Sequence, residues 1–511
     1  MEIESIKPLL AVGVSLLGAA LIVATRKSPN IREGCSLVAA ILKFLIVATM
    51  IPSVLAGKTL HMTLFSFLPD VSIALRVDAL GLLFATTASF LWIVTTLYSV
   101  GYMRSLNEHA QTRYYLCFAI TMSATISVAF SANLLTLYIF YELITFFTYP
   151  LVAHKETDKV FAAGNKYVFY LLMSAKFFLL AIILTYVFAG TMDFRPNGIF
   201  TSKVNTTILT LTYFLFLAGI SKAAIMPFHA WLPAAMVAPV PVSALLHAVA
   251  VVNTGVFCVL RVIFHIFGVE LMKTLNLGAV TAIIASFTII VASIYAFTRD
   301  DLKERLAYST ISQLSYIVLG GALLTSSGMA GGIIHIVNHA FSKITLFFCA
   351  GSIYVASHKT KISEMSGIGR KMPWTMTAFA LGTLSMIGVP PAAGFLSKWY
   401  LMTGSIEAKE LPFLFVLLAS SLLNAGYFLP IVHNAFFGGS QKEVLHPVPQ
   451  SVGAAAAGFH ESHPHEGRGQ LQPIHEPSYL IVIPLLLCAV ISVILGIYPN
   501  FLLELIRLVV R

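Results

Sequence analysis

The sequence predicts an all-α integral membrane protein with about 14 transmembrane helices. Of its 511 residues, 58% are hydrophobic and 11% are charged, whereas a soluble globular protein has roughly 25% charged residues. This composition excludes a soluble enzyme, a nucleic-acid-binding protein and a disordered protein. About 20 mostly apolar residues are needed to cross the hydrocarbon core of a bilayer. Such segments lie at 8–25, 35–55, 78–100, 113–131, 132–153, 165–190, 205–224, 241–265, 277–297, 305–325, 330–356, 375–403, 411–437 and 478–503.

The distribution of Lys and Arg predicts the orientation. An even number of spans places both termini on one side. Loops that follow odd-numbered spans hold seventeen Lys and Arg residues, and the opposite side holds ten. Because cytoplasmic loops carry the excess of positive charge, both termini are expected on the outer side of the plasma (bacterial inner) membrane. The net charge of +10 is thus explained without a nucleic-acid partner. Glu2 and Glu4 do not fit a cleavable signal peptide, so the first segment is expected to remain as a span.

Several ionisable residues lie inside the predicted spans. A charge at the bilayer centre costs at least about 2.5–3.5 kcal/mol, and such residues by default mark an ion or proton path. His335, His339 and Lys343 follow an i, i+4, i+8 spacing, which aligns them along one helix face. Lys43 is expected to extend towards a lipid headgroup instead. The full set is Lys43, Lys176, Lys222, Lys343, Lys398, Glu142, His247, His335 and His339.

Prolines interrupt two of the predicted spans next to a lysine. Pro227 follows Lys222, and Pro390 and Pro391 precede Lys398. Proline removes an intrahelical hydrogen bond, and non-helical backbone at membrane depth is tolerated only where it is buried or lines a cavity. Broken helices in corresponding positions of two halves indicate a transport site within inverted repeats.

The position of the two breaks suggests how the chain is organised. Five helices separate them, which fits a five-helix unit that occurs twice, the second time inverted. The expected parts are helices 1–3 (1–112), the first repeat with helices 4–8 (113–265), the second repeat with helices 9–13 (277–437), a cytoplasmic loop that contains histidines (438–477) and helix 14 (478–511).

Five segments carry a family resemblance and occur in the family's order. They are YELITFFTYPLV (141–152), KAAIMPFHAWLPAAMVAPVPVSALLHAVAVVNTGVFCVLR (222–261), ERLAYSTISQLSYIVLG (304–320), HIVNHAFSKITLFFCAGS (335–352) and IGVPPAAGFLSKWYL (387–401). They resemble the antiporter-like proton-pumping subunits. That family includes the large membrane-arm subunits of respiratory complex I, the A and D subunits of Mrp-type cation/proton antiporters, and their counterparts in membrane-bound hydrogenases.

The resemblance implies a role for each intramembrane residue. Glu142 and Lys222 are expected to form the ion pair of a first half-channel, and His247 to pass the proton on. His339 and Lys343, with His335 on the same face, are expected to hold the proton centrally. Lys398 is expected to be the terminal lysine of the exit half-channel.

Two positions depart from the family pattern. Asn253 stands where the family usually has a second lysine, and an amide cannot titrate. Lys176 stands where relatives tend to carry a small or apolar residue. One hypothesis is that Lys176 supplies the charge missing at Asn253. The alternative is a lysine that snorkels or faces lipid, unrelated to the path.

The resemblance implies a subunit that moves protons, alone or in exchange for sodium, beside other membrane subunits in the lipid bilayer. The host is expected to be a redox complex, either complex I-like or a membrane-bound hydrogenase. The alternatives are the D-type member of an Mrp cation/proton antiporter with no redox partner and a solitary secondary transporter. Because Arg511 follows the last span closely, the long lateral helix of the largest complex I subunit is not expected.

No catalytic centre, cofactor or metal is expected in this chain. It has no Walker lysine, no GxGxxG before a strand and no CxxCH. Its five cysteines stand singly, without the spacing of a zinc or iron–sulfur site. Five histidines gather in the loop 438–477 among Gly, Ala, Pro and Gln, which favours a solvated loop over a metal site: His446, His460, His463, His465 and His475.

Overall fold

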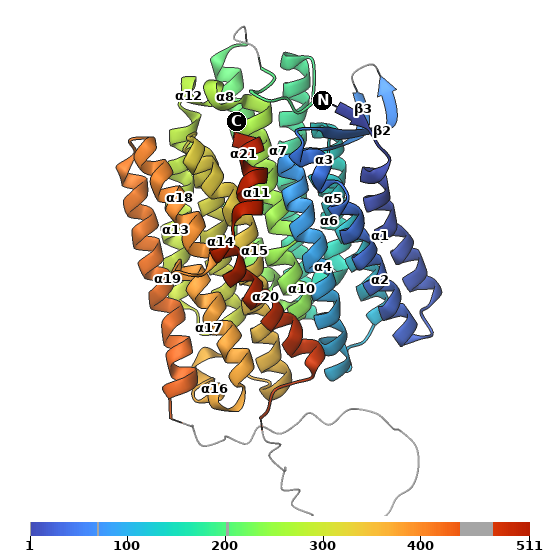
Figure 1. Cartoon of the computed structure of the whole chain (residues 1–511), viewed down its shortest axis with the longest axis vertical. Coiled ribbons are helices and arrows are strands. Elements are labelled where there is room, and N and C mark those ends of the chain that lie inside the picture. The colour runs from blue at the N-terminus through green and yellow to red at the C-terminus, as the bar shows by residue number, and fades with distance from the viewer. Residues whose placement is uncertain (1, 69–70, 201–203, 440–473, 511) are drawn as a thin grey trace, which may run out of the picture.

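A computed structural model describes residues 2–68, 71–200, 204–439 and 474–510. It shows a bundle of helices that run mostly along the long axis of the molecule (Figure 1). The two marked chain ends lie at the upper end of the view, as an even number of crossings requires. Most of the predicted histidine-containing loop, residues 440–473, lies outside the described residues.

The described helices follow one another closely along the chain. The α-helices are α1 (Lys7–Ala24), α2 (Pro29–Ala48), α3 (Ile51–Leu55), α4 (Ala79–Ser105), α5 (Gln111–Ala129), α6 (Leu134–Val152), α7 (Asp158–Ala189), α8 (Thr206–Gly219), α9 (Trp231–Ala234), α10 (Val240–Ala248), α11 (Val251–Arg261), α12 (Val269–Thr274), α13 (Leu277–Thr298), α14 (Leu302–Ala322), α15 (Ser326–Ser357), α16 (Ile368–Lys371), α17 (Pro373–Ile387), α18 (Ala393–Glu407), α19 (Leu411–Phe437), α20 (Tyr479–Ile497) and α21 (Asn500–Val510). The 3₁₀ helices η1 (Ser221–Ala223), η2 (Ala235–Val237) and η4 (Ile362–Glu364) and the π-helix η3 (Val262–Phe267) complete the set.

Each of the predicted spans coincides with a helix or with consecutive helices in the described residues. Ten helical segments there are long and apolar enough to cross a membrane. The remaining predicted spans correspond to α5, α8, α14 and the pair α17 and α18, which are shorter or richer in Ser, Thr and charged residues. The multi-pass helical fold is therefore confirmed, whereas the count of 14 is not.

A small β-sheet was missed by the sequence analysis. Strands β1 (Glu2–Glu4), β2 (Thr59–Leu68) and β3 (Val71–Val77) pair in the order β1-β2-β3, with β1 parallel and β3 antiparallel to β2. A search for long apolar runs does not detect strands, in which successive side chains point to opposite faces with a period of two. The sheet lies at the upper end of the molecule, beside the N-terminus (Figure 1).

Two sets of helices repeat the same order. α5, α6, α7, the broken α8 and the pair α10 and α11 form the first set; α13, α14, α15, the broken pair α17 and α18, and α19 form the second. The third helix of each set, α7 or α15, has 32 residues. Among the described residues, α15 packs against α14, α17 and α18 of its own set and against α10 of the first set.

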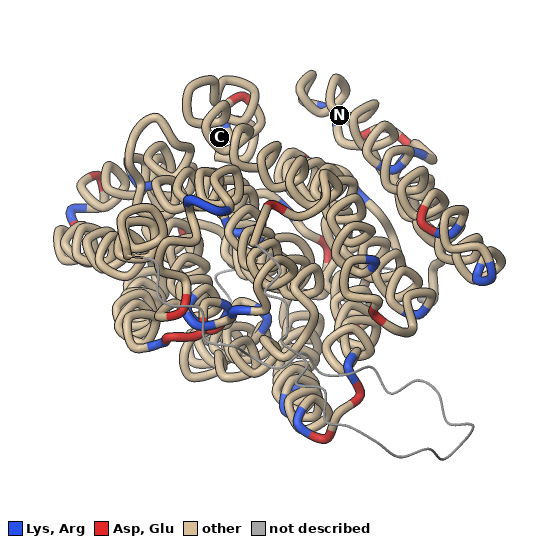
Figure 2. The backbone as a smooth tube through the Cα atoms, turned by 90° about the horizontal axis from the view of Figure 1, so that it is seen from below, with Lys and Arg blue, Asp and Glu red and all other residues tan. Residues whose placement is uncertain are grey.

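Charged residues are sparse along the chain. Figure 2 shows the tube mostly in tan, with Lys and Arg in blue and Asp and Glu in red on short, scattered stretches. One charged pair at the upper end fastens the sheet to the bundle. Asp78 caps the N-terminus of α4 by accepting a hydrogen bond from Gly81 N, and its carboxylate also binds the guanidinium of Arg261 at the end of α11. Burial by itself raises the pKa of Asp78, but the charge and hydrogen bonds of Arg261 outweigh burial and lower it below its ordinary value.

Candidate functional site

Lys222 lies at a helix break, as predicted. α8 ends at Gly219, the single turn η1 holds Lys222, and Ala224 then adopts a left-handed backbone conformation. The Lys222 side chain is completely buried. Its ammonium donates a hydrogen bond to the carbonyl of Tyr141 in α6 and lies 3.3 Å from the centroid of the Tyr141 ring. A carbonyl dipole and an aromatic face thus hold a charge that the interior would otherwise disfavour.

Glu142 follows Tyr141 and acts on Lys222 through space. Their charges interact, yet the ion pairs found among the described residues do not include a direct Glu142–Lys222 contact. Glu142 Oε1 is buried and accepts no hydrogen bond within the described part of the chain. The carboxylate is therefore a nearby charge and not the immediate partner of the ammonium.

The backbone of the first break packs directly against Gly255 in α11. A Cβ atom added at Gly255 in α11 would lie 2.2 Å from Ala223 N and 2.2 Å from the carbonyl carbon of Lys222. Any side chain at position 255 would displace the break. The backbone of Lys222 thus packs against Gly255, and its ammonium contacts Tyr141.

His247 connects the first set of helices to the central helix α15. It lies in α10, is completely buried, and has no hydrogen-bond partner on either ring nitrogen among the described residues. Its ring centroid is 4.7 Å from that of Phe347 in α15. Asn253, the departure from the family pattern, donates from Nδ2 to the Ala248 carbonyl at 2.8 Å, across the discontinuity between α10 and α11.

The predicted stripe on α15 is buried along its whole length. His335, His339 and Lys343 are each at most 1% exposed. The Lys343 ammonium donates to Ser309 Oγ at 2.7 Å and to the Leu306 carbonyl at 3.3 Å, both in α14. His339 has no partner on either ring nitrogen within the described residues. The stripe therefore forms a line of titratable groups in the interior of the bundle.

His335 is the best anchored member of this line. Its Nδ1 lies 2.8 Å from Ser397 Oγ and its Nε2 lies 3.1 Å from Gln313 Oε1. Ser397 Oγ also donates to the Gly394 carbonyl at 3.1 Å. Ser397 directly precedes Lys398, so this histidine contacts the segment that carries the next lysine.

Lys398 lies beyond the second break. α17 ends at Ile387, Pro390 and Pro391 fall in the gap, and α18 begins at Ala393. The Lys398 ammonium donates to the carbonyls of Met386 and Ile387 at 3.0 and 2.9 Å and to Ser421 Oγ at 3.0 Å. It therefore occupies the C-terminal end of α17, where freed carbonyls and the helix dipole favour a cation.

The second break also has a glycine, Gly394, where two stretches of backbone pack directly against each other. A Cβ atom added at Gly394 would lie 1.7 Å from the Ser385 carbonyl oxygen. The first turn of α18 is thus pressed against the last turn of α17.

Neutral residues that the sequence analysis did not select connect Lys343 to Lys398. Ser309 accepts from Lys343 and from the Tyr427 hydroxyl at 2.9 Å. Tyr427 also contacts Asn424 Oδ1, and Asn424 Nδ2 reaches the Met386 carbonyl at 3.4 Å, which Lys398 shares. Polar residues in α14 and α19 thus bridge the two lysines.

Lys43 lies where the sequence did not place it, and the position of Lys176 agrees with the second of the two alternatives given for it. Lys43 is completely buried instead of reaching a headgroup; it donates to the Met122 carbonyl at 2.9 Å and lies 4.8 Å from the Trp92 ring centroid. Lys176 lies on the exposed face of α7 beside Met173 Sδ, whereas Asn253 is buried. The structure does not bring Lys176 and Asn253 together, so it gives no support to the idea that one replaces the other.

Comparison with known proteins places this arrangement in a family. The family model described as "NADH:quinone oxidoreductase/Mrp antiporter, TM" matches residues 131–424. NADH-quinone oxidoreductase subunit N of Desulforudis audaxviator is 31% identical over 73% of this chain and 74% of the relative. NAD(P)H-quinone oxidoreductase chain 5 of Synechocystis is 31% identical over 82% of this chain, and the match spans 64% of that relative's length.

Two solved assemblies contain chains of the same fold. A chain of the Mrp complex from Dietzia superposes with a TM-score of 0.87, and a chain of the membrane-bound sulfane sulfur reductase, an archaeal respiratory membrane complex, superposes with 0.84. Each covers 99% of this chain at 22% identity. The family match covers more than half of the chain and includes both Lys222 and Lys398. The chain therefore belongs to the NADH:quinone oxidoreductase/Mrp antiporter family of membrane subunits.

Proposed function

We propose that this chain is a proton-translocating subunit of a larger membrane complex. The observation that carries the proposal is the pair of buried lysines, Lys222 and Lys398, each at a helix break with its ammonium on backbone carbonyls. Between them lies a buried line of imidazole and ammonium groups. A buried lysine bound by carbonyls and a movable charge can exchange a proton when that charge moves.

The path follows the contacts. Glu142 acts on Lys222 in the first set of helices. His247 faces α15, where His339 and Lys343 lie in the centre. From Lys343, Ser309 and Tyr427 extend towards Lys398, and His335 reaches the same segment through Ser397. A proton that leaves Lys222 thus has titratable or hydroxyl-bearing neighbours in the direction of Lys398.

The two sets of helices are proposed to be inverted repeats, residues 113–265 and 277–437. Their helices follow the same order, the third helix has the same length, and the fourth is broken beside a lysine. A unit with an odd number of spans enters the membrane from opposite sides when it occurs twice in tandem. Each repeat is then suited to open towards one side of the membrane.

The proposed location is the plasma membrane, with both termini outside. The loops that hold the larger number of Lys and Arg residues would face the cytoplasm. Labelling of a single cysteine introduced at Lys58 in a cysteine-free variant tests the orientation. A membrane-impermeant maleimide should label it in intact cells, and labelling only after lysis would reverse the orientation.

The proposed host is a redox complex. The curated relatives at 31% identity are quinone oxidoreductase subunits, which favours this host. The likeness to a chain of an Mrp complex supports the alternative, an Mrp-type antiporter in which protons exchange for sodium.

Purification of the intact complex under gentle conditions distinguishes the hosts. Its subunits would be identified by mass spectrometry, and iron and nickel would be measured in the same peak. Stoichiometric iron–sulfur subunits would establish the pumping arm of a redox enzyme. Membrane subunits alone, without metal, would establish the antiporter, and sodium-dependent proton flux would then be measured in vesicles.

Proton flux tests the function itself. Vesicles that contain the complex should acidify or alkalinise when the complex is energised by its redox substrate or by a sodium gradient. Lys222→Met should remove this flux while the complex still assembles. A fully assembled Lys222→Met complex with undiminished flux would overturn the proposed function.

A further inference from the structure

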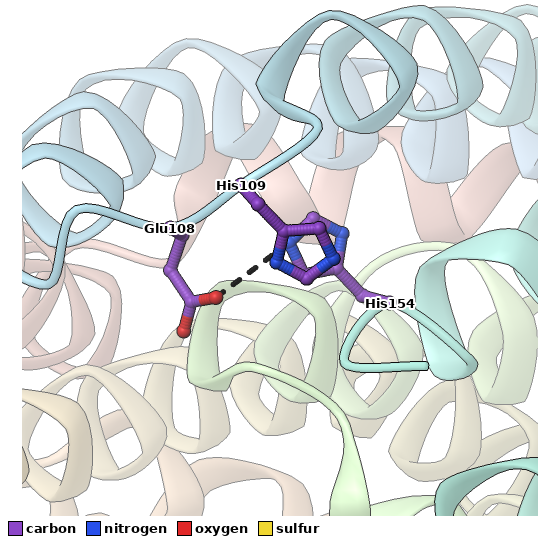
Figure 3. Close-up of side chains that lie close together, drawn as sticks. All are labelled: Glu108, His109 and His154. Carbon is purple, nitrogen blue, oxygen red and sulfur yellow. Dashed lines mark ion pairs between the residues drawn. The ribbon is translucent and has the colours of Figure 1, made fainter. Parts of the chain in front are cut away.

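Three metal-ligating side chains meet at the lower end of the molecule, away from the lysine path. Glu108 and His109 lie in the turn between α4 and α5, and His154 lies in the turn after α6 (Figure 3). One potential ligand atom from each residue lies within 4.8 Å of the other two. Arg113 ties the same two turns together, because it pairs with Glu156 and donates to the His154 carbonyl at 3.3 Å.

His154 is the unusual member of this cluster. It is completely buried, yet neither ring nitrogen has a hydrogen-bond partner among the described residues. Glu108 Oε2 lies 3.7 Å from His154 Nε2, close but beyond hydrogen-bond distance (Figure 3). A buried polar group without a partner costs roughly 1–3 kcal/mol, so its retention requires an explanation.

Glu108 and His109 can turn so that their ligand atoms and that of His154 surround one metal ion. His109 is exposed, so its ring can turn without disturbing the bundle. Its ring now lies 4.8 Å from that of His154, centroid to centroid, at an angle of 29°. Tetrahedral zinc with bonds of about 2.0–2.1 Å needs ligand atoms roughly 3.3 Å apart, which a rotation of His109 and Glu108 can provide.

We propose that Glu108, His109 and His154 bind a divalent transition-metal ion, for which Zn²⁺ is the best fit. Two imidazoles and a carboxylate are a zinc ligand set, whereas Mg²⁺ and Ca²⁺ prefer oxygen ligands. The partial exposure of Glu108 and His109 leaves a fourth position for water. The bound ion clamps the α4–α5 turn to the turn after α6.

Metal content of the purified full-length protein tests the site. After chelator treatment and dialysis, the protein would be titrated with Co²⁺ alone, whose visible absorption reports tetrahedral coordination. We expect about one equivalent of tetrahedral Co²⁺ that Zn²⁺ displaces. His109→Ala, on an exposed position, should remove this signal and leave the melting temperature of the metal-free protein unchanged, and Glu108→Gln should weaken binding.

Two controls separate the cluster from other histidines. His433→Ala changes an exposed histidine outside the cluster and should leave the titration unchanged. A variant in which His446, His460, His463 and His465 are alanine should also retain the signal, because the proposed ligands are Glu108, His109 and His154. Retention of the signal in His109→Ala, or its loss in the loop variant alone, would overturn the proposed site.

An independent observation concerns the outer face of α7. Lys176 is exposed there among exposed apolar side chains, including Phe169 at 61% and Ile183 at 50%. Its ammonium lies 3.8 Å from Met173 Sδ, and the ion pairs of the described residues do not include it. Phe177 and Leu180 extend the same face.

The depth expected for Lys176 in a bilayer disfavours water and lipid headgroups as its partner. The polar start of α7 ends at Lys166. Ten residues further along an α-helix correspond to about 15 Å, near the middle of a hydrocarbon core of roughly 30 Å. Thirteen residues remain before the helix ends at Ala189. An unpaired ammonium at this depth costs at least about 2.5–3.5 kcal/mol.

We infer that this face of α7 is covered by a transmembrane helix of another subunit that presents an Asp or Glu to Lys176. A carboxylate on a helix can reach the required depth, and it neutralises the charge that lipid cannot. The inference rests on the proposed place of the chain in a membrane complex. The inference thus identifies the exposed face of α7 as an interface and a carboxylate as the group that contacts Lys176.

Cross-linking in the intact complex tests this interface. A photoreactive phenylalanine analogue at Phe177 should cross-link to a transmembrane peptide that carries an acidic residue within two turns of the linked position. Lys176→Glu should lower the recovery of that subunit at least fivefold, and Glu or Asp→Lys at the identified partner position should restore it. Lys176→Arg serves as the matched control and should assemble normally.

Two outcomes would overturn the interface. One is cross-linking to lipid alone or to a helix without an acidic residue, and the other is normal assembly of Lys176→Glu. Either result leaves the proposed function intact if Lys222→Met still removes proton flux. Loss of the proposed function would appear instead as undiminished flux in that variant.

Discussion

The two broken helices each hold a buried lysine, but they do so through different contacts. At the first break, Lys222 donates to a carbonyl of a neighbouring helix, and the charge of Glu142 acts on it from nearby. At the second, Lys398 donates to Met386 and Ile387, the last carbonyls of the helix that precedes it in the sequence, and to Ser421. The first lysine therefore has a carboxylate nearby, whereas the polar contacts of the second are two carbonyls at a helix end and a serine hydroxyl.

Removal of either ammonium should have the largest effect. Lys222→Met and Lys398→Met keep side chains of similar length but cannot carry a proton. Each should lower proton flux in vesicles at least about 100-fold, equivalent to roughly 2.7 kcal/mol in the barrier. Lys273→Met, at an exposed lysine in α12, is the control and should transport normally. More than a tenth of the wild-type flux in either buried variant would remove that lysine from the path.

The direct ion pair of Asp78 and Arg261, at the upper end of the bundle, should behave differently from Glu142 and Lys222. Asp78→Asn leaves Arg261 without its carboxylate and should destabilise the protein by about 2 kcal/mol, less than the 3–5 kcal/mol for a fully buried pair, because the Asp78 side chain is 17% exposed. Thermal unfolding in detergent measures this loss, and proton flux per folded molecule should not change.

The pH dependence of the same pair follows from the lowered pKa of Asp78. A carboxylate with a depressed folded-state pKa contributes stability above the pKa of the unfolded chain, about 3.9, and loses it as pH falls through the folded value. The difference in melting temperature between wild type and Asp78→Asn should thus be constant from about pH 5 to pH 8 and shrink in stronger acid. A difference that grows as pH falls would contradict this assignment.

Glu142→Gln tests whether the first lysine depends on a movable charge. The carbonyl and ring of Tyr141 still hold Lys222, so the fold should be unaffected. Proton flux should fall about tenfold, or 1.4 kcal/mol, and Glu142→Asp should recover part of it. If the Gln variant pumps normally, Lys222 does not depend on the charge of Glu142.

Tyr427→Phe tests the bridge between the central and terminal lysines. It removes the hydroxyl that contacts Ser309 and Asn424. One hydrogen bond contributes roughly 0.5–1.5 kcal/mol, so flux should fall about threefold. Tyr295→Phe, at a half-exposed tyrosine, is the matched control. Equal flux in both variants would exclude the bridge as part of the path.

Ser421→Ala should have the smallest effect. Lys398 loses one of three hydrogen bonds and keeps the carbonyls of Met386 and Ile387, so flux should fall by about twofold or less. Ser420→Ala, at the adjacent buried serine that lies near Ser293, provides the comparison. A loss as large as that in Lys398→Met would show that the hydroxyl, and not the helix end, controls this lysine.

The spans and the buried ionisable groups were predictable because both leave strong signals in the sequence. An ionisable group in an apolar run is costly enough to be noticed, which is how Lys222, Lys343 and Lys398 were found. A proline next to such a group indicates the break. The role of each lysine, by contrast, required the contacts: the sequence does not show that Lys398 binds the carbonyls of Met386 and Ile387.

The missed features depend on tertiary packing. Ser309, Tyr427 and Asn424 are ordinary residues of helices, and only the approach of α14 and α19 makes them a bridge. Lys43 and Lys176 look alike in the sequence, yet one helix face packs inward and the other outward. Glu108, His109 and His154 come from two turns that the fold brings together.

The glycines at the two breaks determine what can move. Backbone lies directly against backbone at Gly255 and Gly394, so a shift of either helix towards its partner would force atoms into overlap. We therefore expect the part that moves in each half to be the lysine side chain, an ammonium on four methylene groups. Such a movement of the lysine side chain needs only rotations about its own bonds, which are far faster than the sliding or tilting of helices.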